Sequence, residues 1–495
     1  MKRVIHIWSQ QSPRQQAVWW GLLAAGVPIL VGELLLRILG GSYAMLSPHW
    51  SDEIGYWIQA RAWHVAQFDA GYFTINEIVA PFAWSHYGPH GIFIAMLYGL
   101  VDGSQLQSVV MVNMGVFVVC CVLSAVTAQW SWRTALIITL TLTIFPYVLL
   151  LMPSSMQEMV HVGFAVVLAT GFYRLMEGHP VRVWLVLSIM LAMLIRPTWG
   201  LLLVPALVLE TQTKAWYVRI GYALAAFVLF GIGNYVMGGT SSPFPNLRMK
   251  YYVDIQNATD LFNATWAYFQ HSMAVIQQPV DPMFLLNRVL AVVLVVGPIV
   301  MWIIAKIRQR ASISGAEVAL HCWNIAGLYA ALSVLYEFID GRDFRVASPH
   351  MLFSILLTVQ RRQWTWVYVV LLWCVISMPA MWQQYKDVQT IRTQPRVIDP
   401  SFARLLTFDR QQSSWCNTIA VANRYADKQS EILMGIPPGF GVTHLTKGHP
   451  LGLKSQYMLL DAGEYDLISQ KLPLQQLMTV NDGALYRNLA STCTP

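Results

Sequence analysis

Long apolar stretches separated by short polar turns dominate residues 1–385 of the chain. The clear runs, most of them near the roughly 20 residues that cross a bilayer, occupy 17–36, 106–127, 134–152, 159–176, 217–237, 284–304, 317–335 and 365–382. Shorter apolar pieces at 91–101, 183–195, 200–210 and 346–359 suit tilted, short or re-entrant helices. This pattern predicts an all-α polytopic membrane protein with about ten to twelve transmembrane helices.

Basic residues in short loops predict the orientation, because such loops tend to stay in the cytoplasm. The loops concerned carry Arg174 with Arg182, Lys214 with Arg219, Lys306 with Arg308 and Arg310, and Arg361 with Arg362. The N-terminus is then cytoplasmic, and the outer face carries 39–88, 153–158, the turn at Arg196, 239–283, 337–350 and everything after about 385. The number of spans between 89 and 152 stays open, since two apolar pieces lie where the orientation needs an odd number.

From about residue 386 the composition becomes ordinary, with mixed charges, Pro-Gly turns and short apolar stretches such as YMLLDAG that are typical of strands. We therefore predict two domains: a transmembrane domain over 1–385 and a small extracytoplasmic α/β domain over 386–495. Cys416 and Cys493 both fall in this second domain, where an oxidising compartment would preserve a disulfide. The sequence leaves both the bridged and the free state open.

Composition agrees with a membrane location, since 56% of residues are hydrophobic and only 12% are charged, against roughly 45–50% and about 25% in soluble proteins. The net charge of +7 partly reflects the basic cytoplasmic loops. We find no basic surface interleaved with aromatic residues, so the composition gives no support for a nucleic-acid partner.

Polar residues of catalytic types gather in the predicted outer loops. Asp52 and Glu53 follow the first span in HWSDEIGYWIQARAW. The aromatic spacing of the loop 39–88 around them predicts amphipathic segments lying on the membrane surface. His86 and His90 lie at the mouth of the next helix in SHYGPHGIF, and Glu158 lies at another outer turn in PSSMQEMVH. Three polar clusters are therefore expected on one face.

Two further polar residues accompany Glu158. His161 follows it by three positions and shares its helix face, so the pair could hold a divalent cation or each other. Arg196 interrupts an apolar stretch, which makes it a functional candidate; it could equally bond Glu158 or the carbonyls freed by Pro197. No D-x-D motif and no His/Cys cluster with metal-ligand spacing is present, so metal dependence stays open.

Two arginines stand on the outer face against the charge bias of the other loops. Arg342 and Arg345 lie at the end of a span in YEFIDGRDFRVASPH. An arginine fork binds phosphate oxygens through two parallel bonds and stays charged, which suits a lipid-phosphate clamp. The alternative is that both arginines snorkel and pair with Asp340 and Asp343.

The pattern D-E-x-x-Y formed by Asp52, Glu53 and Tyr56, followed by a surface loop and by the outer acid Glu158, resembles the C-type glycosyltransferase superfamily. Its members include the protein O-mannosyltransferases and the lipid A aminoarabinose transferases. The resemblance covers residues 1 to about 385. It implies a sugar donor on a polyprenyl phosphate, with Asp52 as the general base that activates the acceptor and Glu53 as its neighbour.

We therefore expect a membrane glycosyltransferase that passes a sugar, with inversion, to a lipid, glycan or protein acceptor at the extracytoplasmic face. The expected catalytic residues are Asp52, Glu53 and Glu158, and the expected substrate-binding residues are Tyr56, His86, His90, His161, Arg196, Arg342 and Arg345. A transporter or flippase for a lipid-linked or anionic substrate is the main alternative, and a polysaccharide ligase or polymerase is another. The enzyme is favoured because the acids lie in surface loops, whereas transporter sites lie at mid-membrane.

Overall fold

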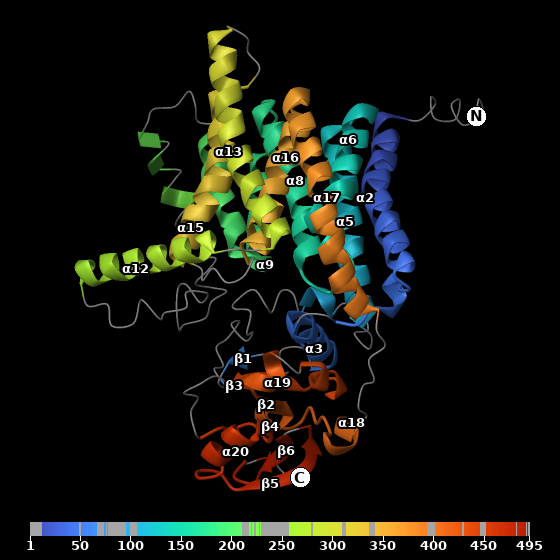
Figure 1. Cartoon of the computed structure of the whole chain (residues 1–495), viewed down its shortest axis with the longest axis vertical. Coiled ribbons are helices and arrows are strands. Elements are labelled where there is room, and N and C mark those ends of the chain that lie inside the picture. The colour runs from blue at the N-terminus through green and yellow to red at the C-terminus, as the bar shows by residue number, and fades with distance from the viewer. Residues whose placement is uncertain are drawn as a thin grey trace, which may run out of the picture.

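The structure, a computed structural model of the chain, combines a bundle of helices with a smaller sheet unit at one end of it (Figure 1). It describes residues 12–48, 51–66, 74–75, 77, 96–99, 106–209, 257–278, 281–308, 313–335, 342–393, 401–427, 430–445, 452–481, 483–491 and 493, with a few positions between 217 and 228. The predicted membrane protein with a small C-terminal sheet domain is confirmed in these terms.

Within the described residues, five helices are long and apolar enough to cross a membrane. They are α2 (Pro13–Ile38), α5 (Leu106–Ala128), α8 (Glu158–Met176), α13 (Pro282–Ile307) and α17 (Trp364–Arg392). Shorter apolar helices are α6 (Trp132–Ile144), α9 (Arg182–Ile195) and the segment formed by η3 (Pro197–Leu202) and α10 (Leu203–Val208). The total of about ten to twelve spans stays a prediction.

Helix α16 (Arg342–Gln360) is almost entirely buried and packs along α8. Outside it, α12 (Ala258–Gln277) runs across the direction of the bundle helices (Figure 1). Helix α16 therefore contributes side chains to the interior of the bundle. Helix α12, by contrast, leaves Phe262 and Trp266 exposed.

Two of the predicted spans are interrupted helices. The run over 134–152 is divided between α6 and α7 (Pro146–Leu151), because Pro146 has no N–H to continue the helix and starts a new one. The run over 317–335 consists of α14 (Gly315–Cys322), the π-helical turn η6 (Trp323–Gly327) and α15 (Leu328–Leu335). Apolar periodicity alone does not reveal such interruptions, since both sides of each break are hydrophobic.

The sheet unit has six strands in the order β1-β3-β2-β4-β6-β5. Strands β1 (Thr74–Ile75), β3 (Gly441–Leu445), β2 (Thr418–Ala422) and β4 (Tyr457–Asp461) are parallel, whereas β6 (Gly483–Asn488) and β5 (Leu474–Val480) pair in antiparallel fashion. Strands β2 and β3 are buried along their whole length, as central parallel strands usually are. The short helices α18 (Ser401–Leu405), α19 (Asn423–Asp427) and α20 (Ala462–Ile468) complete the unit.

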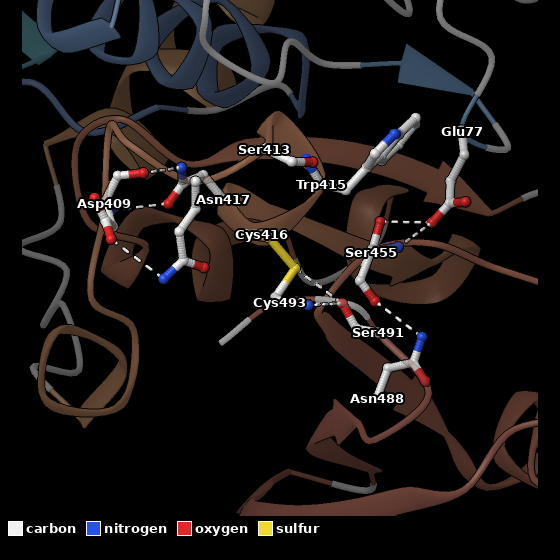
Figure 2. Close-up of a disulfide and its surroundings, with 11 residues drawn as sticks. Glu77, Asp409, Ser413, Trp415, Cys416, Asn417, Ser455, Asn488, Ser491 and Cys493 are labelled. Carbon is white, nitrogen blue, oxygen red and sulfur yellow. Dashed lines mark hydrogen bonds between the residues drawn. A yellow bond between two sulfur atoms is a disulfide. The ribbon is translucent and has the colours of Figure 1, made fainter. Parts of the chain in front are cut away.

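A disulfide joins Cys416 to Cys493, which decides the alternative that the sequence left open (Figure 2). Nearby, Glu77 from the segment after α3 accepts hydrogen bonds from the backbone N–H and the hydroxyl of Ser455, at 2.7 and 2.6 Å (Figure 2). Together with the pairing of β1 on β3, these bonds attach a segment from the first part of the chain to the C-terminal unit.

Helix α3 (Ser51–Ala66) lies between the bundle and the sheet unit (Figure 1). Ile54 and Ile58 belong to the core of the sheet unit, whereas Tyr56 and Trp57 belong to the core of the bundle. The position of α3 relative to the membrane surface therefore stays a prediction. Helix α3 carries two apolar faces, and protein covers both of them.

Candidate active site

Arg345, near the start of α16, contacts both Asp52 in the first turn of α3 and Glu158 at the start of α8. Arg345 Nη1 donates to Asp52 Oδ2 at 2.9 Å, and Arg345 Nε donates to Glu158 Oε1 at 2.9 Å. Arg345 Nη2 also lies 2.9 Å from Glu158 Oε1. One guanidinium therefore bridges two carboxylates that come from different helices.

A proline in α16 explains how Arg196 reaches this group. Because Pro349 has no N–H, the carbonyl of Arg345 four residues earlier lacks its intrahelical partner. Arg196 Nη1 donates to that carbonyl at 2.9 Å, and the hydroxyl of Tyr147 donates to it at 3.2 Å. Arg196 Nη2 also donates to Glu158 Oε1 at 3.1 Å, so Arg196 holds the backbone of α16 and the buried carboxylate together.

The members of the group differ in their access to solvent. Glu158 is fully buried and Arg196 nearly so, whereas the side chains of Asp52 and Arg345 are 28% and 30% exposed. Among the described residues, Asp52 Oδ1 has no hydrogen-bond partner. Arg345 has five N–H donors and directs three of its nitrogens at carboxylates, so two donors remain. Asp52 and Arg345 are thus the two members that a substrate can touch.

Tyr56 lies one helical turn after Asp52 and is almost fully buried. Burial raises the pKa of its phenol, and the nearby carboxylates of Asp52 and Glu158 raise it further. Tyr56 is therefore a neutral hydrogen-bonding group beside the acids and carries no charge at neutral pH.

Glu53 points to a different partner although it is the neighbour of Asp52 in the sequence. Its Oε1 accepts from Arg392 Nη1 at 2.7 Å and from the backbone N–H of Ser155 at 2.9 Å. Both Glu53 and Arg392 are fully buried. Glu53 therefore lies in a second network, separate from the Asp52–Arg345–Glu158 group.

His161 belongs to a third network inside the bundle. Trp199 Nε1 donates to His161 Nδ1 at 3.0 Å, and the Trp199 ring stacks on His350 with 4.2 Å between ring centroids. His350 Nε2 in turn lies 3.1 Å from the hydroxyl of Thr198. In the part of the chain that the structure describes, no group of three His, Cys, Asp or Glu residues could hold a metal ion.

The structure thus brings Asp52, Glu158, Arg196 and Arg345 into one hydrogen-bonded group. The histidines at 86 and 90 and the side chain of Arg342 lie outside the described residues. Sequence reasoning missed Arg392 and Tyr147. Arg392 had one usable signal, since it is a basic residue that ends a long apolar helix on the side predicted to face outward.

These features define a helical membrane protein with an acid–arginine group where the bundle meets a sheet unit. No protein-family model matches the chain, and no curated protein matches it. Among solved structures, the chain is similar to ArnT from Cupriavidus metallidurans bound to undecaprenyl phosphate, with 13% identity, coverage of 96% of this chain and 99% of that chain, and a TM-score of 0.47. The apo state of the same protein gives 14% identity, coverage of 97% and 100%, and a TM-score of 0.46.

Proposed function

We propose that this protein is a membrane glycosyltransferase that moves a sugar from a polyprenyl-phosphate donor to an acceptor, with inversion. The observation that supports this proposal is the Asp52–Arg345–Glu158 group, in which a partly exposed carboxylate adjoins a partly exposed guanidinium. Such a pair offers a proton acceptor and a phosphate ligand side by side.

In the proposed reaction, an acceptor hydroxyl or amine attacks the anomeric carbon of the donor sugar. Asp52 takes the proton that the acceptor loses, through Oδ1. The bond between the anomeric carbon and the phosphate oxygen breaks, and its electrons leave with the polyprenyl phosphate. Attack opposite to the departing phosphate inverts the anomeric centre, and no covalent sugar–enzyme intermediate is needed.

Arg345 supports both ends of this displacement. Its two remaining N–H donors suit the phosphate oxygens, on which negative charge grows as the bond breaks. Its bond to Asp52 fixes the direction of the base. Glu158, fully buried and in contact with two Arg345 nitrogens, acts as a positioning residue that keeps the guanidinium in place.

We further propose that the group and the sheet unit lie on the extracytoplasmic side and that the N-terminus is cytoplasmic. The bridge between Cys416 and Cys493 supports this orientation, since disulfides persist in oxidising compartments and are rare in the cytosol. The basic loop at Arg361 and Arg362 supports it as well, because α8 and α16 both begin at the acid–arginine group and end towards that loop. Residues 386–495 would then form the extracytoplasmic domain.

The substitution Asp52→Asn tests the function. The amide oxygen can still accept from Arg345, so the fold is retained while the proton acceptor is lost. Release of undecaprenyl phosphate from undecaprenyl-phosphate sugars should fall by about 10²-fold or more, as expected for a general base. Asp281→Asn is a matched control, because the side chain of Asp281 caps α13 by accepting from the backbone N–H of Met283, a role that asparagine fills equally well.

The same experiment addresses the transporter alternative. A transporter would move a labelled lipid-linked substrate across vesicles without cleaving the sugar–phosphate bond. Activity of Asp52→Asn above about a tenth of the wild type contradicts Asp52 as the base. Transport without any cleavage by the wild type contradicts the glycosyltransferase.

A further inference from the structure

A buried ion pair begins at the residue that follows Asp52 in α3, since Glu53 pairs with Arg392. Arg392 Nη1 donates to Glu53 Oε1 at 2.7 Å and to the carbonyl of Pro153 at 3.1 Å. Glu53 Oε1 also accepts from the backbone N–H and the hydroxyl of Ser155, at 2.9 and 3.3 Å. The pair therefore connects the end of α17, the first turn of α3 and the 153–157 turn that leads into α8.

The backbone of Arg392 adds a fourth segment to this junction. Its carbonyl accepts from the N–H of Ser47 at 2.8 Å, in the chain between α2 and α3. The 153–157 turn is held from its other side by Asn113, which donates to the carbonyl of Met156 at 2.7 Å.

We propose that Glu53 and Arg392 are positioning residues that set the distance between Asp52 and Glu158. This inference rests on the proposed function, because it assigns a role relative to Asp52 as the base. Adjacent side chains on a helix are about 100° apart, so anchoring Glu53 fixes both the rotation and the height of the helix turn that carries Asp52. Anchoring the 153–157 turn to the same carboxylate fixes the start of α8 against it.

The contacts predict that the pair controls turnover more than donor binding. When α3 is no longer anchored, Asn113 still holds the 153–157 turn through the Met156 carbonyl, and Arg196 still holds the Arg345 carbonyl, so Arg345 keeps its two contacts with Glu158. Of Asp52, Glu158 and Arg345, Asp52 is the one that α3 carries. Loss of the pair should therefore displace the base and leave the phosphate ligand where it is.

The test compares Glu53→Gln with Glu317→Gln. Glu317 is a matched control because it is also fully buried, lies 3.5 Å from Arg361 Nε and accepts from Gln363 Nε2 at 2.6 Å. It lies at the opposite end of the bundle from Asp52. Both variants neutralise a fully buried carboxylate that contacts an arginine and keep its shape, so both are expected to lose thermal stability.

For Glu53→Gln we expect kcat to fall about tenfold to a hundredfold, since a displacement of about 1 Å at a reacting group has an effect of that size. We expect the donor KM and the affinity for undecaprenyl phosphate to change less than about threefold, against the tenfold or larger loss that a lost phosphate bond would cause. Glu317→Gln should retain kcat. Arg392→Lys, a milder change that keeps the charge, should give an intermediate kcat and serves if Glu53→Gln does not fold.

Equal losses of kcat in Glu53→Gln and Glu317→Gln would overturn the proposal, since they would reflect stability alone. An unchanged kcat in Glu53→Gln or in Arg392→Lys would overturn it as well. A loss confined to the donor KM would assign the pair to donor binding and would also contradict it. These outcomes are separate from failure of the proposed function, which shows in Asp52→Asn.

Discussion

The substitution Arg345→Lys tests whether Arg345 is a ligand of the donor phosphate. The change keeps the positive charge and removes the planar fork. In the structure, three nitrogens of Arg345 lie 2.9 Å from oxygens of Asp52 and Glu158. A single ammonium on a shorter chain cannot reach both carboxylates and a phosphate at once.

The magnitude follows from the number of bonds lost. A hydrogen bond between Arg345 and a charged phosphate contributes about 1.5–3 kcal/mol. Because the side chain of Arg345 is partly exposed, solvent screening favours the lower end of this range. If lysine loses one such bond to the donor phosphate, the dissociation constant for undecaprenyl phosphate should rise by about tenfold to somewhat more than a hundredfold, at 1.4 kcal/mol per factor of ten. This rise in the dissociation constant should exceed the rise caused by an arginine-to-lysine substitution at the protein surface.

The assay is titration of undecaprenyl phosphate against the purified protein in lipid nanodiscs. Arg361→Lys is the matched control, because Arg361 is 26% exposed against 30% for Arg345 and also contacts two carboxylates, those of Glu177 and Glu317. Its affinity should match the wild type. If Arg345→Lys and Arg361→Lys bind the lipid equally well, Arg345 pairs only with its carboxylates and is not a phosphate ligand.

Three further predictions concern the scaffold. Gly21→Ala should destabilise the protein by about 1–3 kcal/mol, because a Cβ there would meet the α5 backbone at 2.5 Å; thermal unfolding of Gly26→Ala, which has open space, should be close to wild type. Cys416→Ser should lower stability by about 4.5 kcal/mol in the chain-entropy treatment, since the bridge to Cys493 closes a loop with a sequence separation of 77; equal melting of the wild type with and without reductant would contradict this. A cysteine at the exposed Ser469 should react with an impermeant maleimide in spheroplasts, and protection until lysis would reverse the proposed orientation.

Much of the bundle could be predicted from the sequence because membrane crossing depends on local composition. An apolar run of sufficient length has few alternatives to a helix in a bilayer, and α2, α5, α8, α13 and α17 each fall on a predicted run. The breaks at Pro146 and at η6 were not predicted from the apolar runs, although Pro146 was a usable signal for the first of them; the π-helical turn η6 has no such signal. Hydrophobic periodicity carries no information about which neighbours satisfy the backbone at a break.

For the candidate site, too, the sequence indicated the residues but not their arrangement. The types of residue at Asp52, Glu158, Arg196 and Arg345 marked them as candidates, because charged groups beside apolar runs are costly unless they have partners. Their assembly was not visible, since the bond between Asp52 and Arg345 joins residues 293 positions apart. Glu53 illustrates the limit most clearly. Its place next to Asp52 suggested a shared role, yet the helix directs the two carboxylates to different arginines.

The site also occupies the places where the helices are irregular. Pro349 leaves one carbonyl of α16 unpaired, and in a membrane protein such a group needs a partner from the protein itself. Arg196 provides that partner and at the same time contacts Glu158. A regular helix at this point would have satisfied its own carbonyl and left Arg196 with one contact instead of two. The irregularity in α16 thus adds a backbone connection, through Arg196, to the direct contacts between Arg345 and Glu158, and both help to keep the partly exposed guanidinium aimed at Asp52.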